Sequence, residues 1–560
     1  MGFGILEPKT EVVEGTVYLF DNTTDTSTTA AQPGVATTTI KHSADGKIVL
    51  QPQPSDHPDD PLRWPLVQRD FCFFLLLVSG VCSGVHGPVL GPVQISLAQR
   101  FDKSATEIAH LTSYMLLVVS LSTYVSNIIA RIYGKRGIFI VALALLVAAD
   151  AWAARASTFN SLLGARCMSG LGQSVFEGIS PSVITDLFFV HERGKRVGLF
   201  VFAIISGVAL GVPISTQIIT HMGLGWAFGI LAIFEGVCLV LVTLFFHEPA
   251  FKREHVDVTA HVDPATIETK QHNLEIELCE VEAVDAASGR HHHHNTNNTA
   301  SATDADGAPL RKSSLANKLS IYHGRFSHQN PFTLLWRGIA LTFHPTIFWC
   351  ALVGLNVAWS VGLAYTIDMT LSVPPYNFTS AGTANMYVAA WLGLAAGMAI
   401  SASSDSMCKY LARHNDAIFE PEFRLLYVPL GTVFSIIGFA GWGWGCEAGV
   451  HWVGLAFFLA FMHAGLAVLG SVGLSYALDA HKIYSNESQV AIIAIKNLFP
   501  YGMGYYFVPW YLESGPKNVW GAISGIITAV SFIGLFFYVY GKRLRAFWMK
   551  HPYLGIETMH

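Results

Sequence analysis

The segment KRGIFIVALALLVAADAWAA, residues 135–154, decides the fold class of this chain. Two basic residues precede an apolar stretch in which Asp150 is the one charge. A stretch of this length crosses the hydrocarbon core of a bilayer as a helix. Similar apolar stretches, separated by short links, run from Phe71 to Asp186. We therefore expect a polytopic membrane protein.

The composition supports a membrane protein and excludes other classes. Hydrophobic residues make up 52% of the 560 residues and charged residues 13%, against about a quarter in soluble domains. The net charge of −5 is small and no basic module is clustered, so we expect no nucleic acid partner. The eight cysteines show no ligand spacing, and we expect no metal and no cofactor.

Hydropathy predicts an all-α membrane protein with twelve transmembrane helices in two pseudo-symmetric six-helix bundles. The expected spans are 71–95, 109–130, 137–154, 160–184, 197–220, 225–247, 344–367, 383–403, 425–445, 450–475, 489–512 and 518–541. The expected domains are a disordered cytoplasmic tail (1–68), an N-terminal bundle (69–247), a disordered cytoplasmic linker (248–338), a C-terminal bundle (339–545) and a cytoplasmic tail (546–560).

The orientation follows from the basic residues of the short loops. Ten Lys and Arg residues fall in loops on one predicted side and four on the other, which places both termini in the cytoplasm. We expect the plasma membrane. Asn377, in the sequon Asn-Phe-Thr of a predicted outside loop, is a candidate glycosylation site. The run His291–His294 lies in the linker and is typical of low-complexity sequence rather than of a metal site.

Charged residues inside predicted spans are the candidate functional residues, because each costs about 3 kcal/mol on insertion unless it has a partner or a cavity. The fourth span carries Arg166, Gln173 and Glu177 on one helical face. Arg166 and Glu177 are separated by about 16 Å along the axis, so we expect different partners for them. Asp150 lies near an outer helix end and is expected to be solvated. The five charges are Asp150, Arg166, Glu177, Glu235 and Lys496.

Several roles remain open for these side chains. Glu177 is the first candidate to load and release a proton or to bind a cationic substrate; alternatively, it is a protonated structural carboxyl. Arg166 either modulates that carboxylate or bonds helix-end carbonyls. Glu235 lies in the middle of the sixth span and is a weaker candidate. Lys496 and Asn497 are candidates for substrate or coupling contacts, although a lysine at that depth can also extend to the interface.

Four motifs make the chain similar to a known family. They read DDPLRWP (59–65), ARCMSGLG (165–172), DLFFVHERG (186–194) and EPEFRL (420–425). They resemble the major facilitator superfamily, and within it the fungal twelve-span drug:proton antiporter branch. The resemblance covers roughly residues 57 to 545. It implies two six-helix halves that rock about a midplane site, driven by the proton gradient.

The resemblance also implies gating loops, with departures from the family pattern. Arg131 stands where the loop after the second helix usually has an aspartate. In the fifth helix Pro213 is displaced by one position and the later glycines are missing. The gating residues that the resemblance implies are Lys135, Arg136, Asp186, Glu192 and Arg193 in the first half and Asp405 and Lys409 in the second.

The expected function is proton-coupled export of a small organic compound: a drug, toxin or metabolite. The expected partners are the substrate, protons and the lipid bilayer, with no obligate protein partner. Proton-coupled uptake of an organic cation such as a polyamine is the alternative, and a non-transporting nutrient sensor is a remote one. We expect no enzyme, because the histidines of the spans share no motif. The sequence also lacks a GxxxxGK[ST] loop, which excludes a P-loop ATPase.

Overall fold

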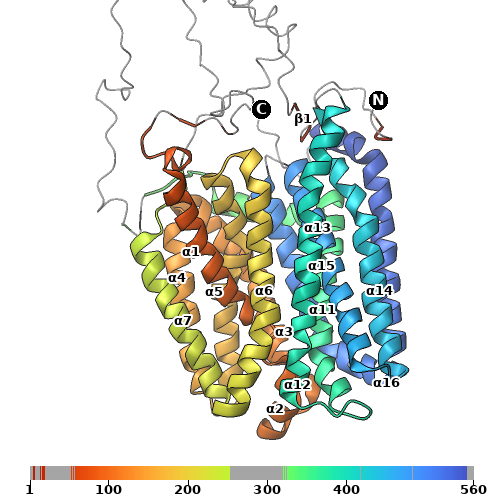
Figure 1. Cartoon of the computed structure of the whole chain (residues 1–560). Coiled ribbons are helices and arrows are strands. Elements are labelled where there is room, and N and C mark those ends of the chain that lie inside the picture. Colours follow the sequence, from red (N-terminus) through yellow and green to blue (C-terminus); the bar gives the residue numbers. More distant parts are fainter. Residues whose placement is uncertain are drawn as a thin grey trace, which may run out of the picture.

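The computed structural model describes residues 52–251 and 320–550 except positions 53, 56, 321, 323, 416, 417, 482 and 483, together with residues 4–6, 13 and 15–18. The run His291–His294 and residues 551–560 lie outside the described residues. Both ends of the described chain lie at the same end of the molecule, uppermost in Figure 1, which we call the upper end.

Helices account for nearly all of the regular structure. The first half contains α1 (Leu66–Val85), α2 (Gln94–Phe101), α3 (Ala105–Tyr133), α4 (Arg136–Ala154), α5 (Phe159–Leu187), α6 (Val190–Met222) and α7 (Leu224–Phe245). The second half contains α10 (Pro331–Thr342), α11 (Pro345–Leu371), α12 (Ser380–Asn385), α13 (Tyr387–Arg413), α14 (Val428–Glu447), α15 (Trp452–Ala480) and α16 (Ser485–Lys550). The shorter elements are β1 (Val17–Tyr18), β2 (Ile418–Phe419) and the 3-10 turns η1 (Pro61–Arg63), η2 (Gly91–Val93) and η4 (Pro421–Tyr427).

Ten helical stretches of the described chain are long and apolar enough to cross a membrane. The last of them, α16, consists of two helices that meet at Gly515 (φ +77°) and therefore supplies two spans. The helix α5 has 29 residues, which is long enough to cross a bilayer, and it carries Arg166 and Glu177. We count it as the twelfth span. The described chain thus confirms the predicted all-α class with twelve spans, and Figure 1 shows the two halves side by side.

The first span ends earlier than predicted. We expected a helix to residue 95, but α1 stops at Val85 and the chain continues through turns into η2. Pro88 and Pro92 explain the difference, because a proline lacks the N–H that would continue the helical hydrogen bonds. The backbone of this segment is therefore free to bond side chains from other helices.

Small residues let the helices of each half approach closely. A Cβ atom on Gly207 of α6 would collide with the Val81 carbonyl of α1. A Cβ atom on Gly393 of α13 would collide with the Ala460 carbonyl of α15. Such contacts between backbones hold helices together in lipid, where burial of apolar side chains gives little net gain.

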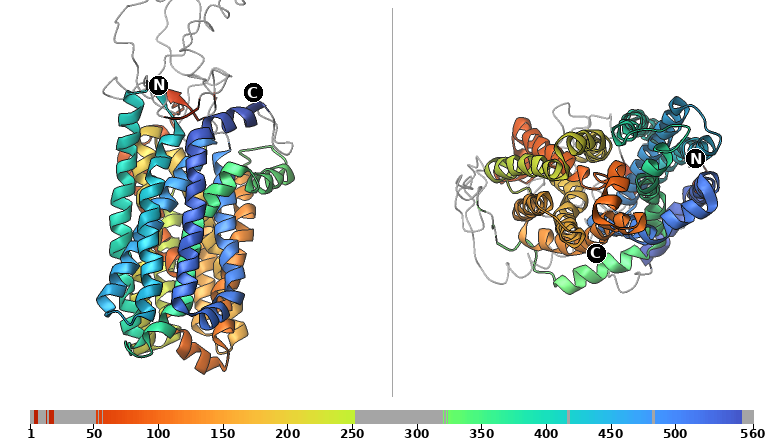
Figure 2. Two further views of the ribbon diagram at one scale, coloured as in Figure 1. Left: turned by 90° about the vertical axis from the view of Figure 1, so that its right-hand side faces the viewer. Right: turned by 90° about the horizontal axis from the view of Figure 1, so that it is seen from below.

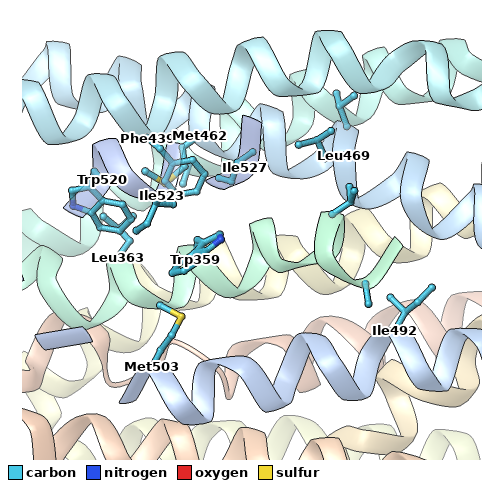
Figure 3. Packing of buried hydrophobic residues seen from close by; sticks show 14 of the residues in the cluster. Trp359, Leu363, Phe439, Met462, Leu469, Ile492, Met503, Trp520, Ile523 and Ile527 are labelled. Carbon is cyan, nitrogen blue, oxygen red and sulfur yellow. The ribbon is translucent and has the colours of Figure 1, made fainter. Parts of the chain in front are cut away.

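The largest apolar cluster lies in the second half and joins α11, α14, α15 and α16 (Figure 3). Trp520 of α16 is fully buried and stacks on Phe439 of α14 with ring centroids 5.8 Å apart. Trp359 and Leu363 of α11 belong to the same cluster. This packing joins the four helices around one apolar core.

Parts of the segments predicted to be disordered are folded. Residues 331–338, assigned to the linker, form the larger part of α10, which lies along the surface and contacts α3 and α16 (Figure 2). The reason is local: Asn330 accepts a hydrogen bond from the Phe332 N–H, and Pro331 suits the first helical position. In the predicted N-terminal tail, Val17 and Tyr18 pair with β2 of the second half. The helix α16 also continues to Lys550, beyond the predicted boundary at 545.

Candidate functional site

Glu177 of α5 binds three side chains, two of them from the opposite half. The Lys496 ammonium lies 2.8 Å from Oε2, and the Asn497 amide donates to the same oxygen at 2.9 Å. The Gln173 amide donates to Oε1 at 3.1 Å. The Glu177 side chain is 11% exposed and that of Lys496 is 21% exposed. Four predicted site residues therefore form one cluster that ties α5 to α16.

The positions of these donors follow from local structure. Gln173 lies one helical turn before Glu177, so their side chains share a face. Lys496 and Asn497 are held in register because Ser120 of α3 donates to the Ala494 carbonyl of α16 at 2.8 Å. With every donor aimed at one carboxylate, the ionised form of Glu177 is stabilised in this arrangement.

Hydroxyl and aromatic groups join the halves below this cluster. The hydroxyls of Ser113 and Tyr365 lie 3.0 Å apart, and those of Tyr114 and Tyr505 lie 2.7 Å apart. The Trp391 indole donates to Ser206 at 3.0 Å. Side chains of α3 and α6 thus meet side chains of α11, α13 and α16. Hydroxyl and aromatic side chains therefore contribute to the interface between the halves, beside an apolar cluster of α6, α13 and α15.

Arg166 belongs to a different cluster, as the spacing along α5 predicted. Its side chain is 1% exposed and donates to the Gly87 carbonyl at 3.3 Å, at the broken end of α1. Nearby, His86 Nε2 lies 3.1 Å from Asp150 Oδ1 and 3.6 Å from Glu235 Oε1. The expectation that Asp150 is solvated is wrong: it is 1% exposed, because His86 and α7 cover it. Sequence reasoning assigned no role to His86, since one histidine in a span carries no pattern.

The predicted gating residues of the first half meet at the upper end. Lys135 Nζ lies 2.6 Å from Asp186 Oδ2 and donates to Ser182. Arg136 donates to the Thr243 carbonyl at 2.7 Å. Glu248, which we placed in a disordered linker, accepts the backbone N–H groups of Lys135 and Arg136 at 2.9 and 3.0 Å. It therefore caps the start of α4.

Glu192 and Arg193 hold the turn between α5 and α6. Arg193 donates to the carbonyls of Phe188 and Thr185 at 2.9 and 2.5 Å. Glu192 lies 3.8 Å from Arg69 of α1. Both residues thus bind groups of the first half, and their gating role stays a prediction.

In the second half, Asp405 does not pair with Lys409, which is exposed. Asp405 instead accepts from Arg424 at 2.8 Å, and Arg424 also donates to Asp479 at 2.6 Å. A second network lies beside it, in which Arg545 binds Glu422 at 2.8 Å and Glu420 at 3.2 Å. The EPEFR motif was noticed in the sequence, but its partners on α15 and α16 are too distant in the chain for spacing to reveal.

A further ion pair joins the halves at the upper end. Arg131 of α3, which replaces the family aspartate, pairs with Glu487 at the start of α16. A cavity of about 230 Å³ lies next to this pair. Its lining includes Asn127, Arg131, Lys135, Ser182, Asp186 and Asn486. Two of the predicted gating residues, Lys135 and Asp186, thus border the same cavity as Arg131.

Asn377 lies in the loop between α11 and α12, at the end of the molecule opposite the upper end (Figure 1). Its side chain is exposed and its φ is +49°. The side chain is open to the surrounding solvent. Glycosylation at Asn377 stays a prediction.

Comparisons with known proteins bear on this geometry. Residues 72–499 match the profile of a family described as Major Facilitator Superfamily. An uncharacterized MFS-type transporter of Schizosaccharomyces pombe is 23% identical, over 92% of this chain and 91% of its own. An efflux pump of Gibberella fujikuroi is 24% identical, over 74% and 65%. The solved proton:xylose symporter XylE has a TM-score of 0.55 at 12% identity, covering 87% of this chain and 100% of its own.

Proposed function

The chain belongs to the major facilitator superfamily, and on that basis we propose that it exports a small organic compound in exchange for protons by alternating access. It is a multi-pass membrane transporter rather than an enzyme, as its relatives are. The direction of transport, the coupling ion and the substrate class are the proposed part. The pairing of Glu177 with Lys496 is the observation that carries the proposal.

Protonation of Glu177 is the proposed coupling step. A proton on its carboxyl removes the negative charge that holds Lys496, so the 2.8 Å ion pair between α5 and α16 is lost. Loss of the proton restores the pair and draws the two helices together. Glu177 can therefore hold either a proton or the ion pair with Lys496 that joins the halves, but not both at once.

The proposed orientation places the upper end in the cytoplasm, in the plasma membrane. Basic residues of the short loops gather at that end, as the positive-inside rule requires. The Arg131–Glu487 pair and the Lys135–Asp186 pair lie at the same end. Separation of the halves there, after Glu177 is protonated, would expose the interface to the cytoplasm.

Export is supported by the relative that is named an efflux pump. Uptake of an organic cation remains the second candidate, supported by the aromatic groups beside the interface. The rings of His110 and Tyr505 lie 4.4 Å apart, and Tyr114 is next to both. Aromatic faces attract cations. A cation that binds Glu177 must displace Lys496, whereas a neutral compound need not.

Purified protein in liposomes tests the proposal. A pH gradient is imposed and labelled neutral and cationic compounds are screened for accumulation. Movement of a compound against the proton flow supports export; movement with the proton flow supports the uptake alternative. Flux that ignores the gradient refutes proton coupling.

Two variants assign the coupling residue. Glu177→Gln should abolish the response of flux to the pH gradient. Glu107→Gln is the matched control, because Glu107 is exposed and caps α3 outside the cluster. If Glu177→Gln and the parent respond to the gradient alike at every pH, Glu177 is not the coupling carboxylate.

A further inference from the structure

His86, Asp150 and Glu235 form a cluster that lies wholly inside the first half. They come from the end of α1, from α4 and from α7, and they are 0%, 1% and 0% exposed. Their nearest atoms are 3.1 Å (His86 to Asp150) and 3.6 Å (His86 to Glu235) apart. Within the part of the chain that the structure describes, none of the three makes a hydrogen bond or ion pair with the second half.

The hydrogen bonds of His86 require a proton inside this cluster. His86 Nδ1 lies 3.3 Å from the Ser83 carbonyl, which can only accept, so Nδ1 carries a hydrogen. A neutral imidazole then has a bare Nε2 facing the Asp150 carboxylate at 3.1 Å. Two acceptors do not approach so closely without a hydrogen between them. Either the imidazole or a carboxyl therefore holds an additional proton.

Glu235 needs the same proton. No donor of the described chain reaches either of its carboxylate oxygens, nor Asp150 Oδ2. A buried carboxylate without donors is strongly disfavoured in its ionised form. A carboxylate oxygen of Glu235 and one of Asp150 lie within 4.8 Å of each other, and two negative charges at that distance disfavour ionisation of both carboxyls.

The charges that face the cluster set its proton number at one. Arg166 of α5 is the nearby cation, and its charge interacts with that of Asp150. The other groups that face the cluster are the thiols of Cys82 and Cys238. With Arg166 positive and the imidazole neutral, two carboxylates leave one negative charge, and one proton neutralises it. A divalent cation in the same place would leave a net charge of +1, so one proton balances the charges of this cluster better than such a cation does.

We propose that His86, Asp150 and Glu235 bind one exchangeable proton at a site separate from Glu177. Its use during transport rests on the proposed function; the binding itself does not. Arg166, the cation that faces this site, lies about 16 Å from Glu177 along α5, toward the end opposite the upper end. The chain would then hold protons at two depths, one inside a half and one between the halves.

Infrared difference spectroscopy of the purified protein between acid and alkaline pH tests the site. A protonated buried carboxyl gives a carbonyl stretching band that disappears when the proton leaves. The parent should show such a band, and it should be lost in Glu235→Gln. It should persist in Glu177→Gln and in the exposed-site control Glu107→Gln. If Glu235→Gln does not fold, Asp150→Asn serves in its place, with the expectation that the band is lost or shifted.

The outcomes separate this site from the proposed function. A band that is unchanged in both Glu235→Gln and Asp150→Asn refutes the site. A metal ion that copurifies with the parent and is lost in Glu235→Gln refutes it as well. If the band behaves as expected while flux in liposomes ignores the pH gradient, the proton site stands and proton-coupled transport falls.

Discussion

Replacement of Lys496 by methionine tests whether the pair with Glu177 holds the two halves together. At 2.8 Å and an effective dielectric constant of about 20, the direct attraction is about 6 kcal/mol, most of which desolvation offsets. Removing the ammonium leaves a buried carboxylate with amide donors only. We expect Lys496→Met to cost about 3 kcal/mol, the lower end for buried pairs, because both side chains keep some exposure.

Glu177→Gln should cost less, about 1 to 2 kcal/mol, because the lysine it leaves can extend toward the interface. The double variant should cost about 2 kcal/mol, less than the sum of the two singles, since no charge is stranded. Thermal unfolding in detergent measures this. For a bundle of about 200 residues we expect Lys496→Met to lower Tm by roughly 6 to 12 °C. Strictly additive shifts would refute the coupling of the two residues.

Three further predictions concern residues outside the proposed site. Arg545→Met should lower the free energy of unfolding by about 3 to 5 kcal/mol, because it removes the ion-pair partner of the buried Glu422 carboxylate. Arg543→Met, at an exposed position, should change the free energy of unfolding little, as thermal unfolding would measure. Burial lowers the pKa of His344 to about 4, below its value of about 6.5 in the unfolded chain. The folded state is therefore favoured above pH 6.5, and its free energy of unfolding falls by about 3 kcal/mol as the pH drops to 4. Tm should fall less steeply with decreasing pH in His344→Phe than in the parent, and an identical slope would contradict this. Gly393→Ala should lower Tm, because the added methyl group would collide with the backbone of α15. Gly502→Ala is the control and should leave Tm unchanged, because the space around Gly502 is open. Equal changes in Tm would show that close contact between α13 and α15 does not cause the loss of stability.

The sequence predicted the spans well, because hydropathy over about twenty residues reflects the bilayer directly. It failed where local chemistry overrides hydropathy. The prolines after Val85 end the first helix early, and the Asn330 cap starts a helix inside a segment that looked too polar to fold.

The sequence predicted which residues belong to the candidate site, but only some of the contacts between them. Periodicity placed Gln173 and Glu177 on one face and separated Arg166 from them, as the structure does. The bond between Glu177 and Lys496 joins positions 319 residues apart, so only tertiary packing could specify it. The burial of Asp150 depends on His86 and Glu235, which come from two other helices.

The pairing of β1 with β2 has a consequence for how far the halves can travel. Tyr18 rests on the second half, and position 52 leads into α1 of the first, so the 33 intervening residues pass from one half to the other. Fully extended, they reach about 110 Å. The two halves are therefore connected twice along the sequence, before α1 and again after α7. A cut after α7 would leave the N-terminal segment, paired with β2, as a remaining link between them.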